Sequence, residues 1–325
     1  MILVICVAVV IVNYKTPELV KACLASLAAE QRDDIVLKVY VGDAESGDGS
    51  VSIIADYIAA ERLDFCKCFA IGTNGGFAYG NNFIVDQHVR DDPDVDFVHF
   101  LNPDTYVRPG AITALVAALQ AHPQAGIVGS RLENADGSPR AYGFRFPTPW
   151  REFFRGARLD LATRLIPAST VKIENLLETR RVDWVTGASF MMPRAVIDRV
   201  GLMDPRYFLY YEEVDLNARV HQAGYEIWHV ADSRVVHIAG QATGVRSDLP
   251  PKRLPSYWYH SRFKFFRDRY GWPRALLANG LFLLGDLVFR AHRLARLKPI
   301  TDPPSLWRDM LTHGFSLPPN RSGAR

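Results

Sequence analysis

Residues 7–43 read VAVVIVNYKTPELVKACLASLAAEQRDDIVLKVYVGD, and this stretch decides the fold class. The continuous, β-branched run at Val7–Val12 predicts a buried strand, and Val36–Val41 predicts a second one. Between them, apolar residues recur at a helical spacing from Pro17 to Ala29. A strand, a helix and a strand in this order predict a βαβ unit and therefore a parallel sheet.

The same alternation continues along the first 130 residues. Further elements are expected in turn: strands at 66–71 and 97–101, and helices near 52–60, 78–88 and 111–121. We therefore expect an α/β protein with a Rossmann-like, mostly parallel central sheet flanked by helices.

The second half of the chain has a different pattern. Trp184–Met192 is typical of a strand, and a helix is expected from about Glu213 to Ala223, where Gly224 ends it. Short strands are expected at 225–230 and 233–237. From about Pro255 the chain becomes helical, basic and aromatic, which predicts a C-terminal helical extension.

Composition narrows the class of protein. The net charge is +3, from 38 basic and 35 acidic residues, and this balance argues against nucleic acid as a partner. Cys66-Lys67-Cys68 has no second cysteine pair, so we expect no zinc site and idle thiols at Cys6, Cys23, Cys66 and Cys68. Free thiols suit a reducing compartment and predict a cytoplasmic protein.

Two apolar segments bear on the membrane question. The N-terminal run of about a dozen apolar residues is too short to span a bilayer and is better explained as a buried strand. The nearest candidate for a membrane helix is Ala275–Val288, which Asp286 and a following Arg-rich stretch interrupt. We expect neither a signal peptide nor a transmembrane helix.

Polar side chains follow each strand of the predicted parallel sheet. They are Asn13 and Tyr14, Asp43, Asn74 to Gly76, and Asn102 and Asp104. Ligands of such sheets bind at the carboxyl ends of the strands, where these loops meet. Taken singly, each residue is explained equally well as a turn or packing residue. Together they predict a binding site at this edge, and Glu212 and Glu213 at a helix start add two carboxylates.

Six motifs in a fixed order carry a family resemblance. They are VVIVNY (9–14), VGDAESGDGS (41–50), GTNGGFAYGNN (72–82), FLNPDT (100–105), WVTGASFMMPR (184–194) and YYEEVDLNARVHQAGYEIW (210–228). Over residues 5–240 the chain resembles inverting family 2 glycosyltransferases of the GT-A fold, in the bacterial rhamnosyltransferase-like branch. The resemblance implies a catalytic domain at 1–250, with a nucleotide-binding half at 1–130 and an acceptor half at 131–250, followed by the extension at 251–325.

The resemblance also implies how a nucleotide-sugar donor is bound. Tyr14 would lie against the pyrimidine ring beside Asn13, Asp43 would accept from the N3–H of the base, and Asn74, Gly75 and Gly76 would form a donor loop. Thymine and uracil stay open. Asp104, with Asn102 nearby, would hold Mg²⁺ or Mn²⁺ on the diphosphate. His237 matches a late metal-binding histidine, with His229 as its competitor.

Catalytic and acceptor roles follow from the same resemblance. Glu213 would be the base that deprotonates the acceptor hydroxyl, with Glu212 as the alternative. Trp184, Thr186, Gly187 and Ala188 would line the acceptor side.

The expected reaction is inverting, metal-dependent transfer of L-rhamnose from dTDP-L-rhamnose to a lipid-linked saccharide in cell-envelope polysaccharide synthesis. Three alternatives stay open. One is a UDP-hexose donor, and another is a non-catalytic module that binds sugar nucleotides. The third, a nucleotidyltransferase, would need a Gly/Lys-rich first loop, which NYKTPE does not provide.

The C-terminal region adds a candidate interaction surface. Residues 255–298 mix aromatic side chains with Arg and Lys, which predicts peripheral contact with an anionic membrane at its inner face. A helical subdomain packed on the catalytic core and a homodimer interface are the alternatives.

Overall fold

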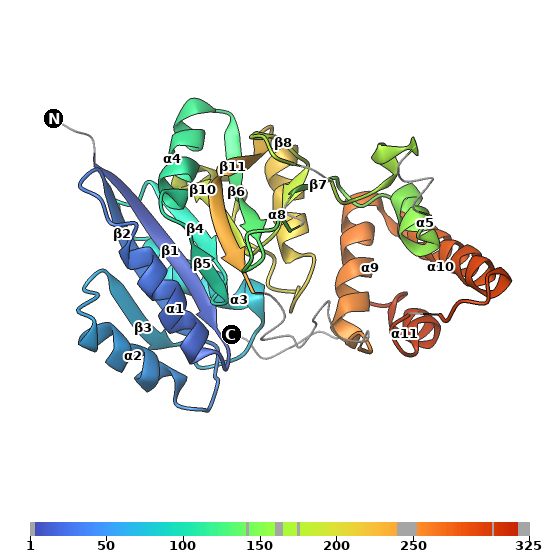
Figure 1. Ribbon diagram of the computed structural model, residues 1–325, viewed down its shortest axis with the longest axis horizontal. Helices are drawn as coiled ribbons and strands as arrows, with labels where there is room; N and C mark the ends of the chain where they lie inside the picture. The colour runs from blue at the N-terminus through green and yellow to red at the C-terminus, as the bar shows by residue number, and fades with distance from the viewer. Residues whose placement is uncertain are drawn as a thin grey trace.

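The computed structural model describes residues 4–140, 143–159, 165–173, 176–238, 252–300 and 302–317 (Figure 1). Within these residues a nine-stranded sheet runs in the order β3-β2-β1-β4-β10-β6-β11-β5, and β8 pairs with β11. Its strands are β1 (Ile5–Asn13), β2 (Ile35–Asp43), β3 (Cys66–Ala70), β4 (Phe97–Leu101), β5 (Thr105–Val107), β6 (Ala125–Glu133), β8 (Arg180–Arg181), β10 (Ser189–Pro193) and β11 (Glu226–His237). A small second sheet pairs β7 (Gly143–Phe144) with β9 (Trp184–Val185).

The sheet is mixed but mostly parallel, as expected. β3, β2, β1 and β4 are parallel neighbours, and β6 and β11 point the same way, while β10, β5 and β8 run against them. Val7 to Ile11 of β1 are fully buried, which explains why this strand is continuously apolar.

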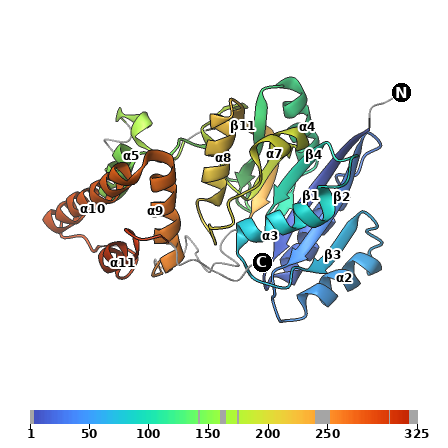
Figure 2. The same ribbon diagram turned by 180° about the vertical axis from the view of Figure 1, so that it is seen from behind.

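Helices cover both faces of the sheet. Helices α1 and α2 lie on one side (Figure 1), and α3, α7 and α8 lie on the other (Figure 2). The helices of this part are α1 (Pro17–Ala28), α2 (Ser50–Ala60), α3 (Phe77–Ile84, continued by a π-helical turn at Val85–Val89), α4 (Ala111–Ala121), α7 (Arg194–Val200) and α8 (Glu212–Gln222).

Three expected strands differ from the structure. The strand expected at Trp184–Met192 is two strands, β9 of the small sheet and β10 of the large one, and residues 186–188 between them border a cavity. The strands expected at 225–230 and 233–237 form one long strand, β11, with an irregularity between Val230 and Arg234. This irregularity keeps β11 paired with β6 up to Val236, next to His237.

The C-terminal helices form a separate layer beside the sheet (Figure 1). They are α9 (Ser256–Tyr270), α10 (Trp272–Ala295) and α11 (Leu306–His313), and α5 (Pro149–Ala157) packs along α10, with a short 3₁₀ helix at Pro167–Ser169. Gly156 and Gly285 allow this packing, because a Cβ at Gly285 would lie 2.1 Å from the Phe153 carbonyl oxygen. The expected domain boundary at 250/251 lies outside the described residues.

A buried ion pair joins these helices. Arg262 of α9 and Glu152 of α5 are fully buried and 2.7 Å apart. Separating the two helices would leave a buried charge without its partner, which is strongly destabilising. The ion pair therefore fixes α5 and α9 against each other. Among the described residues, α10 is the one helix that is long and apolar enough to cross a membrane. In its most apolar 18-residue window, 39% is buried.

Candidate active site

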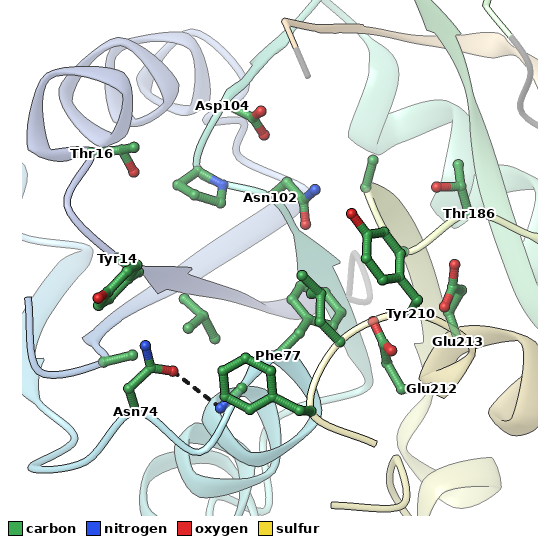
Figure 3. Close-up of a pocket in the computed structure, with 18 of the residues that line it drawn as sticks. Tyr14, Thr16, Asn74, Phe77, Asn102, Asp104, Thr186, Tyr210, Glu212 and Glu213 are labelled. Atoms are coloured by element: carbon green, nitrogen blue, oxygen red, sulfur yellow. Dashed lines mark hydrogen bonds between the residues drawn. The ribbon is translucent and has the colours of Figure 1, made fainter. Parts of the chain in front are cut away.

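A cavity of about 410 Å³ opens at the carboxyl ends of β1 and β4 (Figure 3). It brings together the loop after β1, the loop before α3, the loop after β4, residues 186–188 and the start of α8. Its lining residues are Val12, Tyr14, Thr16, Ala44, Asn74, Gly76, Phe77, Asn102, Pro103, Asp104, Thr186, Gly187, Ala188, Phe208, Leu209, Tyr210, Glu212, Glu213, His237 and Tyr257. Most of the residues expected at the site therefore share one cavity.

Tyr14 and Asn74 occupy one side of this cavity (Figure 3). Asn74 Oδ1 accepts from the Gly76 backbone N–H at 3.2 Å, which shapes the loop before α3. Gly76 has φ +92, and an added Cβ would lie 1.9 Å from the Phe208 carbonyl oxygen. Only glycine fits there, because the conformation is left-handed and the Phe208 backbone lies against it.

Asn13 and Asp43 are buried outside the cavity lining and tie two loops together. Asn13 Nδ2 donates to Asp43 Oδ2 at 2.7 Å, and the Ser46 hydroxyl donates to the same oxygen at 2.6 Å. The Ser46 N–H donates to Asp43 Oδ1, and the Lys15 N–H donates to Ser46 Oγ. Asp43 thus holds the Tyr14 loop in place, with three of its roughly four acceptor positions used by Asn13 and Ser46.

Asp104 and His237 meet at another part of the cavity. His237 Nε2 lies 3.2 Å from Asp104 Oδ1 and 3.4 Å from Asn102 Nδ2. β5 pairs antiparallel with the end of β11, and this pairing brings the late histidine to the early carboxylate. Asn102 Oδ1 is buried without a hydrogen-bond partner among the described residues, so an acceptor oxygen stands free beside the pair. His229 is fully buried in the middle of β11, away from the cavity lining.

Glu212 and Glu213 begin α8 and face the same cavity (Figure 3). Burial and the neighbouring Glu213 charge raise the pKa of Glu212 well above its usual value. Burial raises the pKa of Glu213 to about 7. One carboxylate oxygen of each is buried and has no hydrogen-bond partner within the described part of the chain. The raised pKa favours the protonated form of Glu212, and a pKa of about 7 lets Glu213 exchange a proton near neutral pH.

The residues just before these carboxylates have an unusual backbone. Tyr210 and Tyr211 both take the left-handed conformation, at φ 70 and φ 69. This costs a non-glycine residue on the order of 1–3 kcal/mol and persists only where surrounding contacts impose it. The Phe77 N–H donates to the Phe208 carbonyl at 2.9 Å, and Arg155 of α5 donates to the Tyr211 hydroxyl at 3.0 Å.

The acceptor-side residues divide into two groups. Thr186, Gly187 and Ala188 line the cavity, and a Cβ at Gly187 would lie 3.7 Å from Glu213 Cβ. Trp184 lies outside the cavity lining, where its Nε1 donates to the Arg145 carbonyl and its ring stacks on Phe144. Gly75 also lies outside the lining, packed against Tyr79.

Several lining residues were not predicted from the sequence. Thr16 lies two residues after the VVIVNY motif, Phe77 and Tyr210 lie inside quoted motifs, and residues 208 and 209 precede YYEEVDL, so adjacency was a usable signal. Tyr257 had no such signal, because it comes from α9, far along the chain.

Comparison with known proteins shows the family and the fold. The sequence profile described as "Glycosyltransferase like family 2" matches residues 6–249, and the chain therefore belongs to this family and is a glycosyltransferase. It is 29% identical over 296 residues to N-acetylglucosaminyl-diphospho-decaprenol L-rhamnosyltransferase of Mycobacterium tuberculosis, covering 89% of this chain and 92% of that protein. It is 24% identical over 236 residues to Rhamnosyltransferase WbbL of Escherichia coli K12, covering 72% and 83%.

A solved structure supports the GT-A-like fold. The crystal structure of GalNAc-T7 with UDP, GalNAc and Mn²⁺ superposes with a TM-score of 0.59 at 14% identity. The superposition covers 97% of this chain and 55% of that one, so the chain spans about half the length of this neighbour.

Proposed function

We propose that the protein transfers a hexosyl group, L-rhamnose from dTDP-L-rhamnose in the first instance, to a saccharide on a polyprenyl diphosphate lipid, with inversion at the anomeric carbon. The observation that supports it best is Glu213, a carboxylate with a pKa of about 7 in the same cavity as Tyr14 and Asp104. A group with this pKa accepts a proton readily at neutral pH, as a general base must.

The mechanism assigns Glu213 to the acceptor. Its carboxylate takes the proton of the acceptor hydroxyl while that oxygen attacks the anomeric carbon from the face opposite the leaving diphosphate. Burial and the charge of Glu213 both raise the pKa of Glu212 and so favour its protonated form. Gly187 and Ala188 lack bulky side chains on this side, which leaves space for the acceptor sugar.

The donor occupies the other part of the cavity in this proposal. Tyr14 offers its ring to the pyrimidine, and the loop from Asn74 to Gly76 borders the donor. Asp43 orders the Tyr14 loop and has an acceptor position for the N3–H of the base.

A divalent cation fits beside Asp104. No cluster of three or more His, Cys, Asp or Glu side chains able to hold a metal occurs in the part of the chain that the structure describes. Asp104, His237 and the free Asn102 Oδ1 nevertheless supply oxygen and nitrogen ligands on one side, and Mg²⁺ and Mn²⁺ commonly take their other ligands from substrate phosphates. When bound, the ion would neutralise charge that develops on the diphosphate.

The rhamnosyl donor and the lipid-linked acceptor are supported by the two named relatives. Both are rhamnosyltransferases, and one is named for a diphospho-decaprenol acceptor. At 29% and 24% identity these names leave the donor of this chain to be measured.

A cytoplasmic protein bound to the inner membrane face is part of the proposal, and the four free thiols are consistent with it. The aromatic residues of α9, such as Phe263 and Phe266, are buried, so the contact falls to α10. Leu277, Leu284 and Leu287 of α10 are 51–53% exposed.

The charge around α10 suits an anionic lipid surface. The one acidic residue between positions 272 and 298 is Asp286, which is buried, whereas Arg296 and Lys298 are exposed. A homodimer through the same face is the competing outcome, and size-exclusion chromatography with light scattering distinguishes it.

A donor panel tests the proposed function. Nucleotide release is measured from dTDP-L-rhamnose, UDP-glucose, UDP-galactose and UDP-GlcNAc, with Mn²⁺ or with a chelator, using N-acetylglucosaminyl diphosphate on a short prenyl chain as acceptor. We expect acceptor-dependent release from dTDP-L-rhamnose that chelation abolishes. If nucleotide is released only from a UDP-hexose, that sugar nucleotide is the donor instead of dTDP-L-rhamnose. If no donor supports transfer, the proposal is overturned.

A further inference from the structure

The cavity has an aromatic side formed partly by the C-terminal extension. Tyr257 of α9 lines the cavity, although it lies outside residues 6–249, over which the family profile matches. Its ring centroid is 5.3 Å from that of Phe208 and 6.1 Å from that of Tyr210, and the Tyr210 and Tyr257 rings are inclined by only 23°. The rings of Phe208 and Tyr210, in the loop before α8, are therefore neighbours of the Tyr257 ring of α9.

Tyr210 lies on the carboxylate side of the cavity and the Tyr257 ring lies beside it, whereas Phe208 packs against Gly76 of the loop before α3. Figure 3 shows Tyr210 next to Glu212 and Glu213, whereas Tyr14 and Asn74 lie at the opposite side. An aromatic face beside hydrogen-bonding carboxylates suits a pyranose, whose C–H face packs on a ring while its hydroxyls bond to oxygen atoms. A prenyl chain would require neither carboxylates nor phenol hydroxyls.

We propose that Tyr257, with Tyr210, forms a subsite for the acceptor saccharide, and that the C-terminal extension therefore helps to select the acceptor. This inference rests on the proposed glycosyl transfer and adds a residue that the family match does not cover. The expected ligand is the sugar ring that carries the attacked hydroxyl, with that hydroxyl directed toward Glu213.

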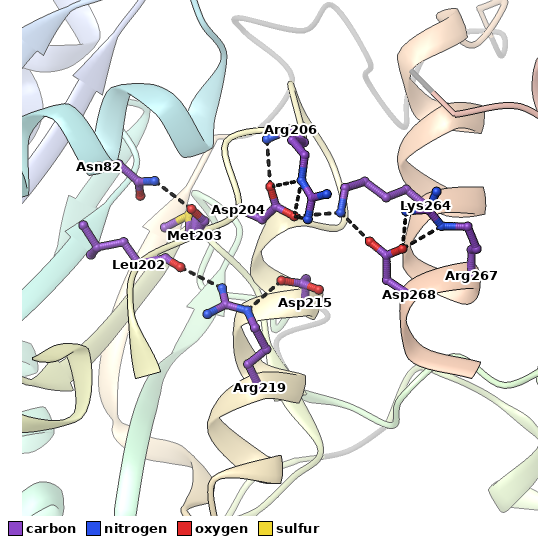
Figure 4. Close-up of polar contacts among 10 residues, drawn as sticks. All are labelled: Asn82, Leu202, Met203, Asp204, Arg206, Asp215, Arg219, Lys264, Arg267 and Asp268. Atoms are coloured by element: carbon purple, nitrogen blue, oxygen red, sulfur yellow. Dashed lines mark hydrogen bonds and ion pairs between the residues drawn. The ribbon is translucent and has the colours of Figure 1, made fainter. Parts of the chain in front are cut away.

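α9 also holds the loop that presents Tyr210 (Figure 4). Lys264 is 2% exposed, and its Nζ lies 2.7 Å from Asp204 Oδ2 and 2.6 Å from Asp268 Oδ2. The Ser261 hydroxyl donates to the Leu209 carbonyl at 3.1 Å. The loop that presents Tyr210 is thus anchored on the same helix as Tyr257, which keeps the two rings in one arrangement.

Steady-state kinetics of transfer give the acceptor KM, which is compared with nucleotide affinity to separate effects on the acceptor from effects on the donor. The acceptor is the N-acetylglucosaminyl diphosphate probe on a short prenyl chain, and dTDP and UDP affinities are measured by calorimetry. We expect Tyr257→Ala to raise the acceptor KM about ten-fold, or about 1.4 kcal/mol, because it removes both the buried ring area and the ring face on which the sugar packs. The Kd of dTDP or UDP should stay within about two-fold of the wild-type value. The proposed nucleotide contacts are at Tyr14 and at the loop from Asn74 to Gly76, away from Tyr257.

Three further variants make the result specific. Tyr257→Phe keeps the ring and should restore the acceptor KM to within about two-fold of wild type. Tyr257→Leu keeps apolar volume without a ring face, so it should behave like Tyr257→Ala, and it replaces that variant if the alanine protein does not fold. Tyr57→Ala, at another partly buried tyrosine on α2, is the control and should leave the acceptor KM unchanged.

The outcomes separate this inference from the proposed function. Wild-type transfer with an unchanged acceptor KM in Tyr257→Ala and Tyr257→Leu overturns the subsite and leaves the proposed function in place. A loss of nucleotide affinity equal to the loss of acceptor affinity also overturns it, because Tyr257 would then act on the donor or on the fold. No transfer by the wild-type protein from any donor overturns both.

Discussion

Replacing Glu213 by Gln should make the protein inactive and, above neutral pH, more stable. The folded-state pKa of about 7 lies above the ordinary value of 4.5, so the folded chain binds this proton more tightly than the unfolded chain does. The stabilising contribution is therefore fully present below about pH 4.5 and is lost as the pH rises through 7. Gln has the shape of the protonated acid and does not ionise, so the variant does not lose this stability as the pH rises.

The magnitude follows from the pKa difference. The rise from 4.5 to about 7 corresponds to roughly 3 kcal/mol at 1.36 kcal/mol per pKa unit. Because the side chain is partly open to solvent, we take about half of this value. At about 2 °C per kcal/mol for a chain of this size, the melting temperature should rise by about 3 °C at pH 8, and by less than 1 °C at pH 5.

Thermal denaturation of wild type and Glu213→Gln at pH 5 and pH 8 measures this difference. Transfer activity should fall by about 10²-fold or more, as expected when a general base is removed. Asp215→Asn is the matched control, because Asp215 is in the same helical turn but pairs with Arg219 at 2.9 Å. It should give no gain at pH 8. A Glu213→Gln protein that melts at or below wild type at pH 8 would refute the burial argument.

Three further predictions concern the donor site, the loop before α3 and α10. Asp104→Asn should lower transfer by about 10²-fold and abolish the effect of Mn²⁺ on dTDP affinity; unchanged Mn²⁺ dependence in calorimetry would contradict the metal assignment. Gly76→Ala should lower the melting temperature, because its Cβ would collide with the Phe208 carbonyl and φ +92 is strained; circular dichroism melts check this. Leu284→Ser combined with Leu287→Ser should abolish co-sedimentation with anionic phosphatidylglycerol vesicles; undiminished sedimentation would exclude this face.

Much of the site could be anticipated because of strand order. Tyr14 and Asp104 each follow a parallel strand, and the carboxyl ends of such strands share one edge, so local patterns place these residues together. His237 joins Asp104 through antiparallel pairing of β5 with β11, a pairing for which no local pattern exists. The prediction that His237 lies near Asp104 came from the family resemblance and not from the periodicity of the sequence.

Other features depend on tertiary packing that the sequence does not encode locally. The sequence predicted one strand through Trp184 and Thr186, but Trp184 belongs to β9 of the small second sheet, where pairing with β7 places it on Phe144 instead of in the cavity lining. The pKa of Glu213 arises from burial by surrounding elements. Tyr257 reaches the cavity because contacts such as Lys264–Asp204 and Ser261–Leu209 hold α9 against the loop before α8.

The stereochemistry of transfer at this cavity tests the central claim most directly. The protein is incubated with dTDP-L-rhamnose, Mn²⁺ and the N-acetylglucosaminyl diphosphate probe, and the anomeric configuration of the product is determined by NMR, with Glu213→Gln in parallel. The account predicts a single product of configuration opposite to the donor, and none with Glu213→Gln. A product with retained configuration, or wild-type yield from Glu213→Gln, would contradict it.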